Sequence, residues 1–211
     1  MKIKYLLGVL GLAALCHGES LIPEGDSWRE TGTKDGVWET YYDNGSVENK
    51  GVYSNNKMNG LFESFYKNGK QKSKGVFDYG RKQGLFEFFY ENGSIQSKVT
   101  YNSDSREGLF EEYFANGKLK KKGVYKNDRE EGIWESYYDN GQLESKGSFV
   151  NGYMDGAFEA YYSTGKLKEK CTYKNGVKVG AFEYYYSTGK LRSKGTYSSE
   201  SSSYGNVQFR R

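Results

Sequence analysis

The sequence predicts an all-β fold, an elongated single-layer antiparallel meander of seven 24-residue β-hairpin repeats. Three observations predict it. A glycine recurs every 24 residues from Gly36 to Gly180 without an insertion. Each copy contains two runs of alternating apolar and polar residues around an Asn-Gly or Thr-Gly, which is a β-hairpin signal. Aromatic residues make up 17% of the chain and there is one proline, a composition typical of strands and turns.

Each copy places the same residue types at the same distances from its glycine. An aromatic residue stands two positions after the glycine and a glutamate follows it, from Glu39 in the first copy to Glu183 in the last. A lysine stands fourteen positions after the glycine, from Lys50 to Lys194. Fixed spacing over seven copies indicates a repeat architecture in which each hairpin stacks on the next.

The turn chemistry predicts how the two strands of a hairpin align. A two-residue loop at Asn68-Gly69 requires positive φ at both residues, which asparagine and glycine tolerate. The opposed pairs are then Glu63–Lys74, Phe62–Gly75, Gly60–Phe77 and Tyr66–Gln71. The alternative is a type I turn with a glycine bulge, which would shift the pairing by one. This alternative suits Thr164-Gly165 and Thr188-Gly189 better, because threonine is β-branched and disfavours positive φ.

An aromatic ring that lies over a cross-strand glycine covers an otherwise exposed backbone. The glycine that faces the ring is replaced only by Val99 and Cys171, whereas Trp134 faces Gly147 in the predicted register. We therefore expect Gly147→Val to destabilise the protein by about 1–3 kcal/mol through overpacking and Gly123→Val to cost little. Cys171 is expected to be a small packing residue and not a reactive thiol.

Strand alternation assigns the side chains to two faces. One face is nearly all aromatic, and the other carries the glutamate–lysine pairs edged by apolar residues. Aromatic self-packing is the expected main role, but tyrosine-rich walls also bind partners at a low entropy cost. The predicted binding surface consists of Trp38, Tyr42, Phe62, Tyr66, Phe86, Tyr90, Phe110, Phe114, Trp134, Tyr138, Phe158, Tyr162, Phe182 and Tyr186. Successive hairpins are expected to join through short polar links such as residues 54–59, which are too short for a crossover helix.

The sequence divides into four segments. Residues 1–18 resemble a signal peptide, because two lysines precede an apolar run too short to span a bilayer. Residues 19–35 are expected to form an N-terminal cap strand, residues 36–197 the repeats, and residues 198–211 a serine-rich tail with a short exit segment. We expect export to the periplasm, the outer envelope or the medium. Lipid anchoring at Cys16 is the less favoured alternative, because Leu15 stands where a small residue is expected.

Few residues could support catalysis or metal binding. The only histidine, His17, lies in the predicted signal peptide, and seven equivalent glutamates that each face a lysine indicate structure and not a catalytic site. The link aspartates Asp104, Asp128 and Asp155 lack a common ligand spacing and are predicted to be solvated turn residues. We therefore expect no catalytic, metal or cofactor site. Removing residues 1–18 removes two lysines and no acid, so the net charge falls from +4 to +2, which argues against nucleic acid as a partner.

The repeated pattern Gly-x-aromatic-Glu-x-aromatic-aromatic-x-Asn-Gly, followed by Lys-Gly-x-aromatic, resembles the MORN-repeat variant family of bacteria over roughly residues 28–197. The resemblance implies an all-β repeat sheet used as an interaction scaffold. Together these features favour a non-enzymatic exported scaffold that binds a protein partner and has no integral membrane span. The alternatives are binding of envelope polysaccharide or peptidoglycan, or an antitoxin-like inhibitor if residues 1–18 are not a signal peptide.

Overall fold

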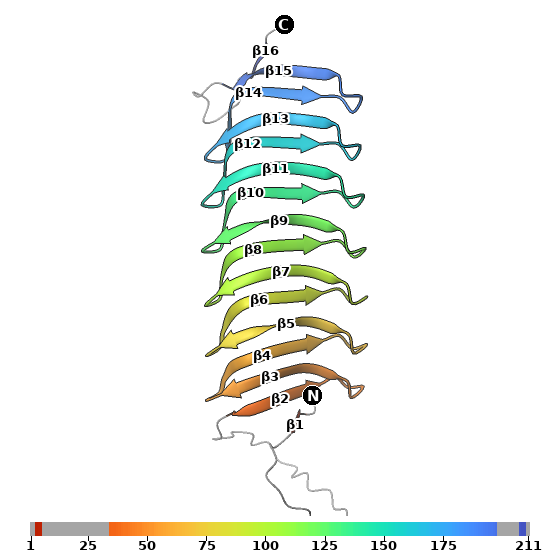
Figure 1. The fold of residues 1–211 in the computed structure, drawn as a ribbon, viewed down its shortest axis with the longest axis vertical. Coiled ribbons are helices and arrows are strands. Elements are labelled where there is room, and N and C mark those ends of the chain that lie inside the picture. Colours follow the sequence, from red (N-terminus) through yellow and green to blue (C-terminus); the bar gives the residue numbers. More distant parts are fainter. Residues whose placement is uncertain (1–2, 6–33, 198–206, 210–211) are drawn as a thin grey trace, which may run out of the picture.

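The computed structural model describes residues 3–5, 34–197 and 207–209. These residues form one antiparallel sheet in which sixteen strands follow one another in sequence order (Figure 1). The strands are β1 (Ile3–Tyr5), β2 (Gly36–Tyr41), β3 (Val47–Ser54), β4 (Lys57–Phe65), β5 (Gln71–Asp78), β6 (Arg81–Phe89), β7 (Ile95–Asn102), β8 (Ser105–Tyr113), β9 (Leu119–Lys126), β10 (Arg129–Tyr137), β11 (Leu143–Val150), β12 (Tyr153–Tyr161), β13 (Leu167–Lys174), β14 (Val177–Tyr185), β15 (Leu191–Tyr197) and β16 (Val207–Phe209). Strands β2 to β15 are the fourteen strands of the seven hairpins, so the predicted meander is confirmed.

The predicted segments at the two termini lie mostly outside the described residues. The predicted cap strand, residues 19–35, is described only at residues 34 and 35. The strand that pairs with β2 is β1, which falls within the predicted signal peptide. In the predicted tail, β16 pairs with β15 and forms the last strand of the sheet.

The turns that close the hairpins, on the right of Figure 1, have three-residue loops. In the second repeat the Tyr66 N–H donates to the Lys70 carbonyl and the Gly69 N–H donates to the Tyr66 carbonyl, both at 2.8 Å. Of the loop residues only Gly69 has positive φ, +81°. This is a type I turn followed by a glycine bulge, so the predicted two-residue loop is wrong and the alternative is right. Threonine fits before the glycine because that position needs no positive φ.

The predicted pairing survives in the body of the strands because a second irregularity compensates for the turn. Beside the loop, Phe65 faces Gln71, and the register shifts by one before Ser64 faces Ser73. The Tyr66–Gln71 pair is therefore wrong. The pairs Glu63–Lys74, Phe62–Gly75 and Gly60–Phe77 are confirmed.

Two-residue loops with double positive φ occur at the opposite side of the sheet, where successive hairpins join. Asn55 and Asn56 have φ of 50° and 65°, and Ser54 pairs with Lys57 on either side of them. The link is thus two residues long, and most of the predicted link 54–59 belongs to strands. Asparagine, aspartate and glycine fill most of these positions because they tolerate the left-handed conformation.

The repeat glycine is a bulge residue. Between the pairs Tyr53–Met58 and Gly51–Phe62, strand β4 contains two more residues than β3. Gly60 lies in this bulge with φ +115°, and all seven repeat glycines have φ between +65° and +119°. A side chain is disfavoured at such φ, which explains why the position is glycine in every copy.

The aromatic face, here called the ring face, is the core of the sheet. Its rings make successive edge-to-face contacts along the stack, with centroid distances of 5.6 Å for Phe62–Phe77, 5.3 Å for Phe77–Phe86 and 5.2 Å for Phe86–Tyr101. Basic side chains cover the rings from the other side. The Lys121 Nζ lies 4.5 Å from the centroid of Trp134, which is only 3% exposed. Rings and cations together therefore bury one face of a single layer.

Four of the rings lean onto a glycine of the preceding hairpin, namely Phe62, Phe86, Trp134 and Phe158. Trp134 pairs with Gly147 in the register, but its indole lies over Gly123, where an added Cβ would be 2.1 Å from the ring. At Gly147 an added Cβ would lie 3.2 Å from Phe158. The expected order of the two valine substitutions is therefore wrong, because the register identifies the opposed residue but not the direction in which the ring leans.

The glutamates and lysines share the opposite face, here called the ladder face. All seven predicted pairs are opposed in the register, from Glu39–Lys50 to Glu183–Lys194. Some lysines bind the glutamate of their own hairpin, as Lys50 does at 3.3 Å, and others bind that of the next hairpin, as Lys74 binds Glu87 at 2.8 Å. Since these lysines are 40–60% exposed, each pair contributes at most about 1 kcal/mol.

Candidate interaction surface

Half of the predicted binding residues belong to the core of the ring face. Phe86, Trp134 and Phe182 are buried, with 4%, 3% and 2% exposure. The others of this row, namely Trp38, Phe62, Phe110 and Phe158, are half-buried. These rings expose little surface, which supports self-packing as their role.

The other half form a row beside the three-residue turns. This turn row consists of Tyr42, Tyr66, Tyr90, Phe114, Tyr138, Tyr162 and Tyr186. The Tyr66 hydroxyl donates to the Phe89 carbonyl at 2.7 Å, and Tyr42, Tyr90, Tyr138 and Tyr162 make the equivalent bond to the next repeat. All except Tyr186 are half-buried. Five members of the row therefore tie their repeat to the next, and the role of the row in binding a partner stays a prediction.

Seven of the thirteen exposed large apolar side chains of the described residues lie together on the ladder face. They form a stripe of aliphatic side chains, here called the aliphatic stripe, that are between 38% and 69% exposed. Its members are Val37, Leu61, Val76, Leu85, Leu109, Val124 and Ile133. The equivalent positions in later repeats include Ser148, Ala157, Thr172 and Ala181, so the stripe is aliphatic only from β2 to β10. Apolar residues were predicted at the edge of the glutamate–lysine pairs, but they were not part of the predicted binding surface.

A shallow hollow of about 290 Å³ lies within the stripe, across β8, β9 and β10. Leu109, Val124 and Ile133 supply its apolar walls, and Glu135 and Lys122 supply a charged side. The Lys122 Nζ lies 2.9 Å from the Glu135 carboxylate. The hollow can therefore accept an apolar side chain beside a neutralised pair of charges.

A tyrosine donates a hydrogen bond to the ladder glutamate in five of the repeats. The Tyr137 hydroxyl donates to Glu135 at 2.6 Å, and the tyrosines at the equivalent positions do the same. The bond from Tyr137 and the ammonium of Lys122 lower the pKa of Glu135 to about 2. Burial and the bond to Glu111 raise the pKa of Tyr113 to about 12. The i, i+2 spacing of glutamate and tyrosine on one strand face could have revealed these bonds from the sequence.

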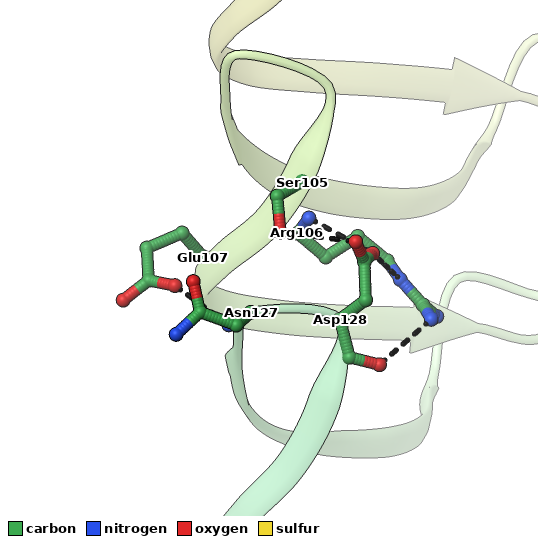
Figure 2. A network of polar contacts seen from close by, with 5 residues as sticks. All are labelled: Ser105, Arg106, Glu107, Asn127 and Asp128. Atoms are coloured by element: carbon green, nitrogen blue, oxygen red, sulfur yellow. Dashed lines mark hydrogen bonds and ion pairs between the residues drawn. The ribbon is translucent and has the colours of Figure 1, made fainter.

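The link aspartates bind neighbouring turns. The Asp128 carboxylate accepts hydrogen bonds from the Ser105 hydroxyl at 2.9 Å and from the backbone and Nε of Arg106 at 3.0 and 2.9 Å (Figure 2). On the same turn the Asn127 N–H donates to Glu107 at 2.8 Å. The bonds from Arg106 lower the pKa of Asp128. These carboxylates thus join one two-residue turn to the next, a role that the prediction of solvated turn residues missed.

The remaining candidates for chemistry are few. Cys171 is 3% exposed, and burial together with Glu169 raises the pKa of its thiol to about 12, which supports a packing role. Within residues 3–5, 34–197 and 207–209, no group of three or more histidine, cysteine, aspartate or glutamate residues could hold a metal ion. The same residues contain no helix that is long and apolar enough to cross a membrane.

The comparison with known families agrees with the geometry of the repeat. No curated protein matches the chain significantly. The family described as MORN repeat variant matches seven segments, residues 34–55, 58–79, 82–103, 106–127, 130–151, 154–175 and 178–199. Each of the first six segments ends at the first residue of a two-residue turn, and every segment contains one hairpin of the sheet. Since these segments cover more than half of the chain, the protein belongs to the MORN repeat variant family.

Proposed function

We propose that this repeat scaffold is not an enzyme and that it binds a protein partner through the ladder face. The observation that carries the proposal is the aliphatic stripe, in which Leu109 is 69% and Ile133 51% exposed. Exposed apolar patches of this kind, bordered by polar groups, are typical of protein interfaces. The ring face is filled by its own aromatic and basic side chains, so the ladder face offers more apolar surface to a partner.

The charges beside the stripe favour a protein partner. The seven ladder glutamates are opposed to seven ladder lysines, so the border is polar and carries no net charge. A neutral polar border suits a protein surface of mixed charge, and it lacks the concentrated positive charge that nucleic acid requires.

Site-directed crosslinking tests this proposal. A photoreactive amino acid replaces Leu109 or Ile133 in the stripe, and in a matched control it replaces Thr172, an exposed residue at an equivalent register position of a later repeat. We expect a discrete protein adduct from the stripe positions in cells of the native organism and none from Thr172. Equal adducts at all three positions, or none, would contradict the proposal. Retention on purified envelope glycan that stripe substitutions leave unchanged would favour the polysaccharide alternative.

We also propose that the protein acts outside the cytoplasm. The basis is the sequence of residues 1–18, with Lys2 and Lys4 before an apolar run. Mass spectrometry of the protein from its native organism should find an N-terminus beyond residue 15. An intact Met1 in the mature protein would refute export and favour an inhibitor that acts in the cytoplasm.

A further inference from the structure

The side-chain hydrogen bonds between repeats beside the three-residue turns all run in one direction. The Tyr66 hydroxyl donates to the Phe89 carbonyl at 2.7 Å, and the Lys70 Nζ donates to the Asn92 carbonyl at 2.8 Å. The Asn68 amide likewise donates to the Glu91 carbonyl, at 3.3 Å. In each case the donor belongs to one repeat and the acceptor to the next repeat in the sequence. The sheet therefore has a donor end after its last repeat and an acceptor end before its first.

The groups of the last repeat have no next repeat to bind. Within the part of the chain that the structure describes, the Tyr186 hydroxyl makes no hydrogen bond and the Lys190 and Lys194 ammonium groups make no ion pair or hydrogen bond. At the other end of the sheet, Glu39 binds a single lysine, Lys50, at 3.3 Å. By contrast, Glu135 lies between two lysines of neighbouring strands.

The two short terminal strands occupy these ends in the register of an additional repeat. Lys4 of β1 is opposite Glu39, just as Lys50 is opposite Glu63 between the first two hairpins. At the other end, Gly195 of β15 is opposite Phe209 of β16, just as Gly51 is opposite Phe62. Among the described residues, each cap pairs with only three residues of its neighbour, Trp38 to Thr40 in β2 and Gly195 to Tyr197 in β15. Figure 1 shows both strands at the ends of the stack.

We propose that β1 and β16 are displaceable caps and that two copies of this chain stack end to end once the caps are released. The cleavage of residues 1–18 proposed above would itself remove β1 and open the acceptor end. Strand β15 of one copy then pairs with β2 of the other in the register of the internal repeats, with Lys194 opposite Glu39 and Gly195 opposite Trp38. The Tyr186 hydroxyl of the first copy donates to the Tyr41 carbonyl of the second, as Tyr66 donates to Phe89. Open edge strands recruit further strands in this way, and a head-to-tail contact without closure extends to an open-ended assembly.

The distribution of donors and acceptors favours this partner over others. Two acceptor ends brought together would place Glu39 near its own copy, and two donor ends would bring Lys190 and Lys194 together. Only the head-to-tail arrangement of two copies brings donors to acceptors. The proposal goes beyond the binding of a partner on the ladder face, because it uses the ends of the sheet.

Proline variants of the uncleaved chain, produced without export so that β1 is retained, test the proposal. Lys4→Pro removes an N–H from β1 and opens the acceptor end, and Gln208→Pro opens the donor end in the same way. Each variant alone still has one closed end and should be monomeric by light scattering after size exclusion. A 1:1 mixture of the two should form dimers that do not grow further. The double variant Lys4→Pro/Gln208→Pro should form longer assemblies as its concentration rises.

Other outcomes would overturn the proposal. A mixture that stays monomeric would show that the ends do not pair, provided that thermal unfolding confirms folded repeats in both variants. Dimers of Lys4→Pro alone would show that two acceptor ends pair with each other. Tyr186→Phe in the Gln208→Pro chain should weaken the mixed dimer about threefold to tenfold, the effect of one hydrogen bond. Tyr162→Phe, which removes the same bond within a chain, should leave the dimer affinity unchanged.

Discussion

The substitution of Gly123 by alanine tests how the rings pack. An added Cβ at Gly123 would lie 2.1 Å from the Cδ2 and 2.3 Å from the Cε2 of Trp134. Both distances are far below van der Waals contact, so the indole must move. Trp134 is 3% exposed and packs against Tyr125 with a centroid distance of 4.9 Å, so its displacement disturbs the neighbouring rings. We expect Gly123→Ala to destabilise the protein by about 3 kcal/mol, the upper part of the range for overpacking.

The matched control is Gly147→Ala. An added Cβ there would lie 3.2 Å from Phe158 and 3.7 Å from the Met154 methyl, so a shift of a few tenths of an ångström suffices. Replacing a strand glycine whose φ is not positive also removes chain entropy from the unfolded state, which contributes about 0.5–1 kcal/mol in favour of alanine. The two effects oppose each other, and we expect Gly147→Ala to change the stability by less than about 1 kcal/mol.

Thermal and urea unfolding followed by tryptophan fluorescence measure both changes. A loss of about 3 kcal/mol corresponds to a fall of roughly 6–12 °C in the melting temperature of a chain of this length. Trp134→Leu should remove most of the effect of Gly123→Ala, since the two residues are in contact and their changes are not additive. Equal melting shifts for Gly123→Ala and Gly147→Ala, or additive effects of Gly123→Ala and Trp134→Leu, would refute the packing described above.

Three further predictions concern the ladder, the cysteine and the turn row. The pKa of Glu135 is lowered to about 2 in the folded protein from an ordinary 4.5. Its contribution to stability is therefore present above pH 4.5 and is lost as the pH falls toward 2. The free energy of unfolding in urea should fall less between pH 7 and pH 3 for Glu135→Gln than for the native chain. The thiol of Cys171, with a pKa raised to about 12, should react with a disulfide reagent only in denaturant, and rapid labelling of the native protein would contradict its burial. Phe114→Tyr should supply the missing hydroxyl of the turn row and stabilise the protein by about 1 kcal/mol, whereas Tyr66→Phe should destabilise it by about as much. Melting temperatures of the two variants that move in the same direction would contradict the row of hydrogen bonds.

Repetition made the fold and the body of the register predictable. A pairing inferred for one hairpin, such as Glu63 with Lys74, had to hold in seven copies, and it does. The loop type was not predictable, because an Asn-Gly can close both a two-residue loop and a three-residue loop with a glycine bulge. The register shift beside Phe65 restores the pairing of Glu63 with Lys74, so this pairing does not distinguish the two loops. The bulge at Gly60 was not recognised either, although a glycine invariant within the repeat is a signal of positive φ.

The candidate site was harder to predict because the sequence does not show which face is covered. Tyrosine and phenylalanine seemed the best contact residues, yet on the ring face they bury one another and are covered by side chains such as Lys82 and Arg106. The smaller aliphatic residues of the stripe on the ladder face remain 38–69% exposed. Burial in a single-layer sheet depends on which long side chains fold over the rings, and strand alternation alone does not determine that.

The separation of the two faces has a consequence for how such a sheet carries a binding surface. The buried rings stabilise the ring face, and the hydrogen bonds of the turn row and of the link aspartates stabilise the two sides of the sheet. None of these contacts involves the aliphatic stripe. At the stripe, leucine, isoleucine, alanine and threonine all occupy equivalent positions, for example Leu109, Ala157 and Thr172, without a change in the strand pairing. A position that tolerates such different side chains contributes little to the stability of the sheet. The ladder face can therefore change its apolar content from repeat to repeat, and the proposed partner contact would account for the large exposed side chains between Val37 and Ile133.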